Sequence, residues 1–124
     1  MGEVIGMADA MLDARAVLIY ATCPSLAEAE RIGGRLVDAG LAACVNILPG
    51  MVSIYVWQGQ RHRDSEVVLI AKTRGGLAKQ AVSEIRSLHP YDNPAVVVLP
   101  VTGGAEAFLS WIEAQTATAA SPAP

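Results

Sequence analysis

Short apolar runs alternate along the chain with segments of helical periodicity. The run at 16–21 has the apolar composition of a strand and is ended by Pro24. Ser25, followed three residues later by Glu28, has the pattern of a capping box, and Gly40 is a plausible helix stop. The first third of the chain is therefore predicted to form one strand followed by one helix.

The middle of the chain predicts a hairpin of two strands. A strand region begins near Ala43, is interrupted at 49–50 by Pro-Gly and resumes over 52–57. Proline within a strand indicates an edge or a bulge, so we expect a long, bent strand. Residues 58–64 are polar and predict a hairpin tip, after which 66–73 returns as the third strand, apolar on both faces in its middle.

The remaining elements complete a regular order. Apolar residues at helical spacing over 77–88 predict a second helix, which must stop by His89 because Pro90 follows. A fourth strand is expected over 95–101 and a short third helix over 105–112. The predicted fold class is α+β, a ferredoxin-like βαββαβ sandwich with an extra C-terminal helix.

The chain length of 124 residues fits one domain. We expect this domain to span residues 15–115. Residues 1–14 have no convincing pattern and are expected to be a disordered leader. Residues 116–124 are rich in Ala, Thr, Ser and Pro, so they are expected to form a flexible tail.

The composition predicts an oligomer. The chain is 52% hydrophobic and 17% charged, against a usual charged share of about 25%. A small domain has too little interior to bury that much apolar surface, so the surplus is expected at subunit contacts. Ser53, Tyr55 and Trp57 alternate on one face of the second strand, and we assign them to an oligomer interface in preference to a ligand shelf.

Charge and motif content exclude several classes of function. Nine basic and twelve acidic residues without a basic cluster argue against nucleic acid as a partner. No apolar run approaches the roughly 20 residues of a membrane-spanning helix. Two cysteines without a CxxC pair, and no secretory signal pattern, favour a reduced, cytoplasmic protein. No nucleophile–base set, P-loop or HExxH motif is present, so no enzyme is predicted.

The segment His89-Pro90-Tyr91 is the first candidate for a functional site. Two prolines, Pro90 and Pro94, stiffen this connection and hold one imidazole and one phenol between a helix and a strand. The alternative for His89 is a structural role at the helix C-terminus, where the last carbonyls accept donors. Both interpretations stay open at this point.

Other candidates have structural alternatives of their own. Cys23 and Cys44 are potential soft-metal ligands or small buried residues; Cys44 is expected in the core and Cys23 nearer the surface. Glu66 and Lys72 share one face of the third strand, where an ion pair across strands or subunits is the simplest expectation.

The chain resembles the CutA divalent-cation tolerance proteins over roughly residues 16–114. The residues that carry the resemblance stand in the family's order: Leu41-Ala42-Ala43-Cys44-Val45-Asn46, Pro49-Gly50, Ser53-x-Tyr55-x-Trp57-x-Gly59, Glu66-Val67, Lys72-Thr73, His89-Pro90-Tyr91, Pro94 and Phe108-Leu109-x-Trp111-Ile112. The resemblance implies a homotrimer of ferredoxin-like subunits, similar to the PII signalling proteins, with strand pairing between subunits through the long second strand.

The resemblance also implies a role in tolerance to divalent metals, copper especially, with a Cys, a His and a Glu as the family's proposed ligands. Here Ala21, Leu88 and Ala95 stand where the family has a cysteine, a second histidine and the glutamate. His89 remains, and Cys23 lies two residues past the vacant cysteine position. A tight Cu²⁺ or Zn²⁺ site needs three or four protein ligands, so only weak metal contact through His89 and Cys23 is expected.

The alternative function is a PII-like small-molecule sensor or signalling adaptor. Clefts between subunits would then hold a small anion or a nucleotide. The residues expected to line such a cleft are Tyr91, Lys72, Trp57 and Glu66.

Overall fold

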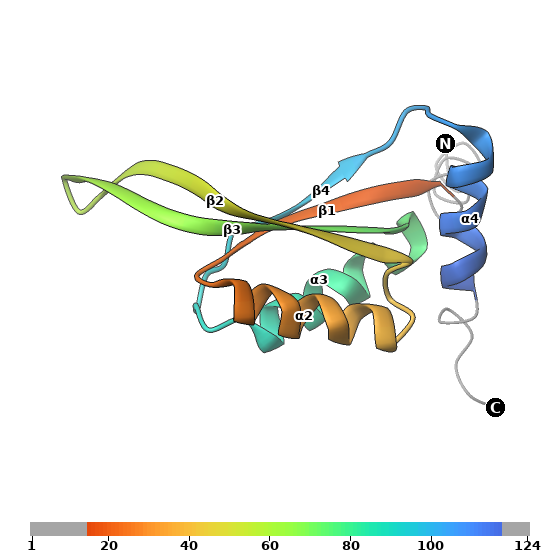
Figure 1. Cartoon of the computed structure of the whole chain (residues 1–124), viewed down its shortest axis with the longest axis horizontal. Coiled ribbons are helices and arrows are strands. Elements are labelled where there is room, and N and C mark those ends of the chain that lie inside the picture. Colours follow the sequence, from red (N-terminus) through yellow and green to blue (C-terminus); the bar gives the residue numbers. More distant parts are fainter. Residues whose placement is uncertain (1–14, 118–124) are drawn as a thin grey trace, which may run out of the picture.

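The computed structural model describes residues 15–117, which form a four-stranded antiparallel sheet with two helices against one face (Figure 1). The elements in chain order are β1 (Ala16–Cys23), α2 (Leu26–Asp38), β2 (Cys44–Trp57), β3 (Gln60–Arg74), a 3-10 turn η1 (Gly75–Leu77), α3 (Ala78–Leu88), β4 (Val96–Pro100) and α4 (Glu106–Ala117). The strand order is β2-β3-β1-β4. The predicted α+β order, βαββαβ with an additional C-terminal helix, is confirmed.

The terminal segments differ in part from expectation. Residues 1–14, expected to be a leader, and residues 118–124 of the expected tail lie outside the described residues. The start of that tail was placed too early, because Thr116 belongs to α4 and is fully buried. Its hydroxyl donates a 2.8 Å hydrogen bond to the carbonyl of Ile112. In the part of the chain that the structure describes, no helix has the length and apolar character that crossing a membrane requires.

Local signals set the ends of α2. The Ser25 hydroxyl accepts a hydrogen bond from the Glu28 N–H at 3.2 Å, which satisfies one of the free donors of the first turn. The Glu28 carboxylate forms an ion pair with Arg31, so only the serine half of the predicted capping box forms. Gly40 has φ +72° just after the last turn, a conformation that glycine adopts without a steric penalty.

The core lies between one face of the sheet and the helices α2 and α3. Its members are mostly small or branched apolar residues with little or no exposed surface: Ile19, Ala21 and Cys23 of β1, Val67, Leu69 and Ala71 of β3, Ala29, Ile32 and Leu36 of α2, and Ala81 and Ile85 of α3. The alanines bring the helices close to the sheet. Strand residues alternate in direction, so the even-numbered residues of β1 and β3 point to the opposite face.

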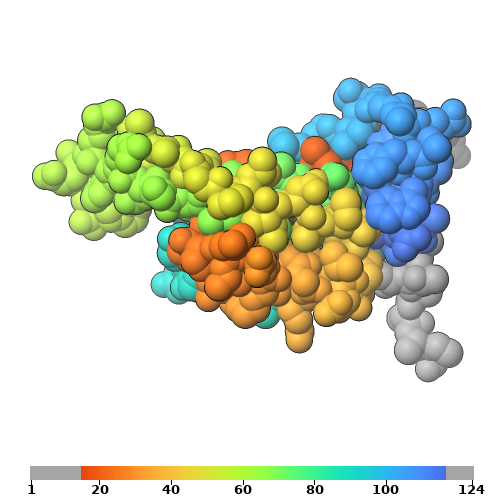
Figure 2. Space-filling view, viewed as in Figure 1, coloured from red at the N-terminus to blue at the C-terminus, as the bar shows by residue number. Residues whose placement is uncertain are grey.

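The β2–β3 hairpin is longer than the polar pattern predicted. Its turn consists of Gln58 and Gly59 alone, with φ values of +50° and +76°, as in a type I′ turn. The expected tip at 58–64 is therefore wrong, because Gln60 to Asp64 pair with β2 in the ladder. Their polarity reflects solvent around a hairpin that extends beyond the helices, and Figure 2 shows it standing clear of the rest of the molecule.

A bulge bends β2 where the sequence predicted an interruption. Leu48 pairs with Val68, and Met51 pairs with Glu66, so β2 advances three residues while β3 advances two. Gly50 has φ +84° at this point. A bulge of this kind increases the local twist and changes which residues of the strand share a face.

The face of the sheet opposite α2 and α3 carries apolar residues that remain exposed. On it lie Val97 and Leu99 of β4, which pair with Tyr20 and Leu18 of β1, and Leu48 of β2. Phe108 and Trp111 of α4 stack with their ring centroids 5.9 Å apart and are also exposed. Isolated chains seldom leave so many large apolar groups in water, and this surface is suited to contact with another protein surface.

The close approach of α2 to the sheet predicts opposite effects at two adjacent glycines. A Cβ on Gly33 would lie 2.9 Å from Val45 Cγ2 and 3.3 Å from Leu69 Cδ1, whereas a Cβ on Gly34 would meet nothing within 4 Å. We expect Gly33→Ala to lower the free energy of unfolding by about 1–3 kcal/mol through overpacking. Gly34→Ala should raise it by up to about 1 kcal/mol through helix propensity. Chemical denaturation of both variants checks this, and equal effects would contradict the packing described here.

Candidate functional site

His89 ends α3 and ties the following loop to β1. Its backbone N–H donates to the carbonyl of Ile85 at 2.9 Å, as expected of the residue that closes the helix. The ring Nε2 lies 2.7 Å from the carbonyl oxygen of Thr22, and Nδ1 accepts a hydrogen bond from the Tyr91 N–H at 3.1 Å. Because a carbonyl can only accept, Nε2 carries the proton and Nδ1 is the acceptor. Both ring nitrogens are therefore occupied by main-chain groups.

The two residues expected to contact a metal are thus poorly placed to do so. His89 is 7% exposed and has no free lone pair, because Nδ1 already accepts from Tyr91. Cys23 is fully buried, and its pKa is raised to about 11 by burial and, to a lesser degree, by the charges of Glu28 and Glu66. The expectation that Cys23 is reachable is wrong; Cys44, expected in the core, is the more exposed of the two. No three His, Cys, Asp or Glu side chains within residues 15–117 are grouped so as to hold a metal ion.

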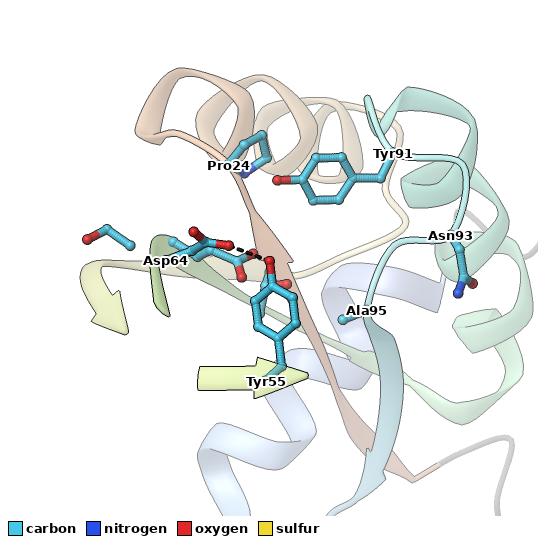
Figure 3. Close-up of a pocket in the computed structure, with 9 residues that line it drawn as sticks. Pro24, Tyr55, Asp64, Tyr91, Asn93 and Ala95 are labelled. Atoms are coloured by element: carbon cyan, nitrogen blue, oxygen red, sulfur yellow. Dashed lines mark hydrogen bonds between the residues drawn. The ribbon is translucent and has the colours of Figure 1, made fainter. Parts of the chain in front are cut away.

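A pocket of about 630 Å³ lies beside the loop that follows His89, on the side of the sheet that the helices leave open. Three parts of the chain meet there: the end of β1, the segment of the β2–β3 hairpin after the bulge, and the loop before β4 (Figure 3). The lining residues are Thr22, Pro24, Tyr55, Asp64, Ser65, Glu66, Tyr91, Asn93 and Ala95. This pocket is the candidate functional site.

The pocket combines negative charge with phenol groups. The Tyr55 hydroxyl donates a short hydrogen bond to the Asp64 carboxylate, and this bond is the main reason that the pKa of Tyr55 is raised. Burial, followed by the charges of Glu66 and Asp64, raises the pKa of Tyr91. Both shifts have the sign expected where negative charge disfavours a phenolate. No Lys, Arg or His is among the lining residues.

The structure brings together some of the residues predicted for a ligand cleft and separates others. Glu66 and Tyr91 line the same pocket. Lys72 lies elsewhere, with its ammonium 5.2 Å from the Phe108 ring centroid, and Trp57 is not among the lining residues. Within one chain, the ion pairs of residues 15–117 include neither Glu66 nor Lys72, so the expected ion pair is not formed there. These cleft assignments between subunits stay predictions.

Sequence reasoning missed two features of this site. Asp64 was placed in the hairpin tip, and Tyr55 was assigned to an oligomer interface with Ser53 and Trp57. The signal that could have found them is the even spacing of Asp64 and Glu66, which puts both carboxylates on one face of a strand. Tyr55 joins that face through its pairing with His62, whose ring stacks on it with centroids 5.3 Å apart.

The contact between Tyr55 and Asp64 predicts a measurable titration. The hydrogen bond favours the neutral phenol, so removing the carboxylate should lower the pKa of Tyr55 toward its ordinary value of 10.0. We expect this in Asp64→Asn, followed by NMR titration of the tyrosine ring signals. Asp38→Asn, which removes an exposed carboxylate on α2, is the matched control and should leave Tyr55 unchanged. A Tyr55 titration that is identical in all three proteins would contradict the assigned contact.

Comparison with known proteins identifies the family. The CutA1 divalent ion tolerance protein family matches residues 17–115. The chain is 39% identical over 100 residues to the chloroplastic CutA protein of Arabidopsis thaliana, covering 81% of this chain and 55% of that protein. It is 39% identical over 99 residues to the divalent-cation tolerance protein CutA of Pectobacterium atrosepticum, covering 80% of this chain and 90% of that protein. The match spans about half the length of the plant relatives.

Solved structures agree with the sequence match. The crystal structure of CutA from Xylella fastidiosa has a TM-score of 0.80 at 39% identity and covers 82% of this chain and 98% of that one. The divalent cation tolerance protein from Thermus thermophilus has a TM-score of 0.78 at 39% identity, with the same coverage. Together, sequence and fold show that this chain belongs to the CutA1 divalent ion tolerance family.

Proposed function

We propose that this chain acts as a homotrimer in tolerance to divalent cations, copper in particular, and that it works by binding rather than by catalysis. Family membership supports the tolerance role, because bacterial and archaeal relatives carry the name divalent-cation tolerance protein. The environment of His89 argues against catalysis by this residue. Its ring nitrogens are held by main-chain groups, so it is not poised as a general base.

The main support for the proposed trimer is a strip of exposed apolar residues along β2, an edge strand of the sheet. Val52, Ile54 and Val56 share one face of β2 and are 43%, 56% and 69% exposed. β2 is also an edge strand of the sheet, so its outer N–H and C=O groups have no neighbouring strand among residues 15–117. An exposed apolar edge strand is a template for pairing with another copy. Three copies joined head to tail would close such contacts into a ring.

Assembly predicts a defined mass and a defined way to disrupt it. Size-exclusion chromatography with light scattering should give three times the 13.0 kDa chain mass. Ile54→Glu replaces an apolar side chain of the strip with a carboxylate and should shift the protein to smaller species, because an assembled trimer would have to remove that charge from water. Val37→Glu makes the same change at an exposed apolar residue of α2 and should keep the trimer. A wild-type monomer, or equal dissociation in both variants, would refute the assembly.

The metal contact in this proposal is weak. A copper or zinc ion at Nδ1 of His89 would have to displace the Tyr91 N–H, and one at Nε2 would have to displace the contact with Thr22. Cys23 offers a buried thiol with a raised pKa, and only the thiolate binds metal well. Tolerance would then depend on something other than a tight Cys–His site in this chain.

The hydrogen bonds of His89 predict that its role is mainly structural. His89→Ala leaves the Thr22 carbonyl and the Tyr91 N–H without partners, so we expect a loss of about 2–4 kcal/mol in unfolding free energy. His62→Ala removes a half-buried imidazole that stacks on Tyr55; it is the control and should lower stability less than His89→Ala does. For the wild type and both variants, denaturation at a fixed protein concentration gives the free energy of unfolding, and Cu(II) titration by calorimetry gives the copper affinity. A micromolar copper site that is lost in His89→Ala without loss of stability would contradict this role.

A second candidate function is a PII-like sensor or adaptor that responds to a small molecule. The observation that favours it is the pocket of about 630 Å³, since small-molecule sites typically measure roughly 300–1,000 Å³. Assembly would add walls from a second subunit to any cleft at this face of the sheet. The lining residues include carboxylates and phenols but no basic side chain, and this indicates which class of small molecule the pocket could bind.

A further inference from the structure

We infer that the pocket beside the Tyr91 loop binds a small organic cation, of the primary amine or guanidinium class. This inference rests on the second proposed function, in which the chain senses a small molecule, and it names the ligand class. Four observations support this inference: the negative charge of the pocket, the unpaired carboxylate of Glu66, the position of two phenol rings, and the size of the cavity.

The charge of the lining is negative. Asp64 and Glu66 are both carboxylates on one face of β3, and no basic side chain lines the pocket. Arg61 and Arg63 are near in sequence, but their odd positions place them on the other face of the strand. The pKa of Tyr55 is raised mainly by its hydrogen bond to Asp64 and the pKa of Tyr91 mainly by burial, and in both cases the charges of Asp64 and Glu66 add to the rise. An anion or a nucleotide phosphate would meet repulsion here.

Glu66 keeps its charge available for a ligand. Among residues 15–117 its carboxylate takes part in no hydrogen bond and no ion pair, while Asp64 shares one oxygen with Tyr55. A half-buried, unpaired carboxylate at the wall of a pocket gains most from a cationic partner that can donate hydrogen bonds. Ammonium and guanidinium groups have both properties.

Two aromatic rings flank the same space. Tyr55 comes from β2 and Tyr91 from the loop before β4; they lie on different sides of the pocket, and the Asp64 carboxylate points toward the Tyr55 hydroxyl (Figure 3). Phenol rings attract ammonium and guanidinium groups that lie over their π faces. Carboxylates and phenols arranged together therefore favour an organic cation over an uncharged ligand.

The size of the cavity distinguishes an organic cation from a bare metal ion. A volume of about 630 Å³ is far larger than one ion requires. Only two carboxylates line it, and no three potential metal ligands of the His, Cys, Asp or Glu type are grouped within residues 15–117. A compound with a hydrocarbon segment would fill the space between Pro24, Ala95 and the rings while its charged end meets Glu66.

The test uses agmatine, which carries an ammonium at one end and a guanidinium at the other, titrated by calorimetry into the purified full chain. We expect saturable binding that weakens as salt is raised. Glu66→Gln should weaken it about tenfold or more, and Asp64→Asn should act in the same direction. Tyr91→Leu should weaken binding, whereas Tyr91→Phe keeps the ring and should retain most of it. Sodium sulfate and ATP should give no binding heat.

Glu106→Gln is the matched control, because it removes one carboxylate from α4, outside the pocket. It should bind agmatine as the wild type does. No binding of agmatine to the wild type, equal weakening in Glu66→Gln and Glu106→Gln, or binding of ATP that survives Glu66→Gln would each overturn the inference. Light scattering on the same samples reports the trimer independently. A trimer that ignores agmatine refutes the ligand class alone, whereas a monomer refutes the proposed assembly.

Discussion

The sheet has two faces, but helices α2 and α3 cover only one of them, and this one-sided coverage governs the rest of the structure. Small residues such as Ala21, Ala71 and Gly33 let the helices approach closely on the covered side. The other side keeps exposed apolar residues on β2, β4 and α4. Within residues 15–117, α4 approaches that side at Lys72, whose ammonium lies 5.2 Å from the Phe108 ring centroid, and the apolar residues of β4 stay exposed. An exposed apolar surface of this kind is suited to contact with another protein surface, and the candidate pocket opens on the same side.

The stiff loop after α3 is tied to β1 by hydrogen bonds of an imidazole. His89 connects the carbonyl of Thr22 at the end of β1 to the N–H of Tyr91 in the loop. The prolines at 90 and 94 limit the backbone on either side of Tyr91. These constraints fix the phenol of Tyr91 at the pocket wall. The histidine that first suggests a metal ligand thus acts as a positioning residue for the wall of a different site.

Most of the fold could be predicted because its signals are local. The helix limits at Ser25, Gly40 and His89 follow from capping and from proline, and the bend in β2 follows from Pro49-Gly50. Features that depend on tertiary contact could not be predicted in this way. Cys23 is buried and Cys44 is less buried because the helices cover the face of the sheet on which Cys23 lies. The polar residues Gln60 to Asp64 form a strand because they pair with β2. The hydrogen bond between Tyr55 and Asp64 could not be predicted without knowing how the residues of β2 and β3 pair in the hairpin.

That register depends on the bulge in β2, which also decides on which face the exposed apolar residues Val52, Ile54 and Val56 lie. Before the bulge, the even residues Cys44, Asn46 and Leu48 share the face of Lys72, Ile70 and Val68. After it, the odd residue Tyr55 pairs with His62 on the face of Asp64 and Glu66. Without the extra residue at 49–50, Ile54 would face the carboxylates and Tyr55 would lie on the other side, because a shift of one residue exchanges the faces of a strand. One bulge therefore places Tyr55 on the hairpin face that carries the carboxylates of the pocket, and it places the exposed apolar residues Val52, Ile54 and Val56 on the other face.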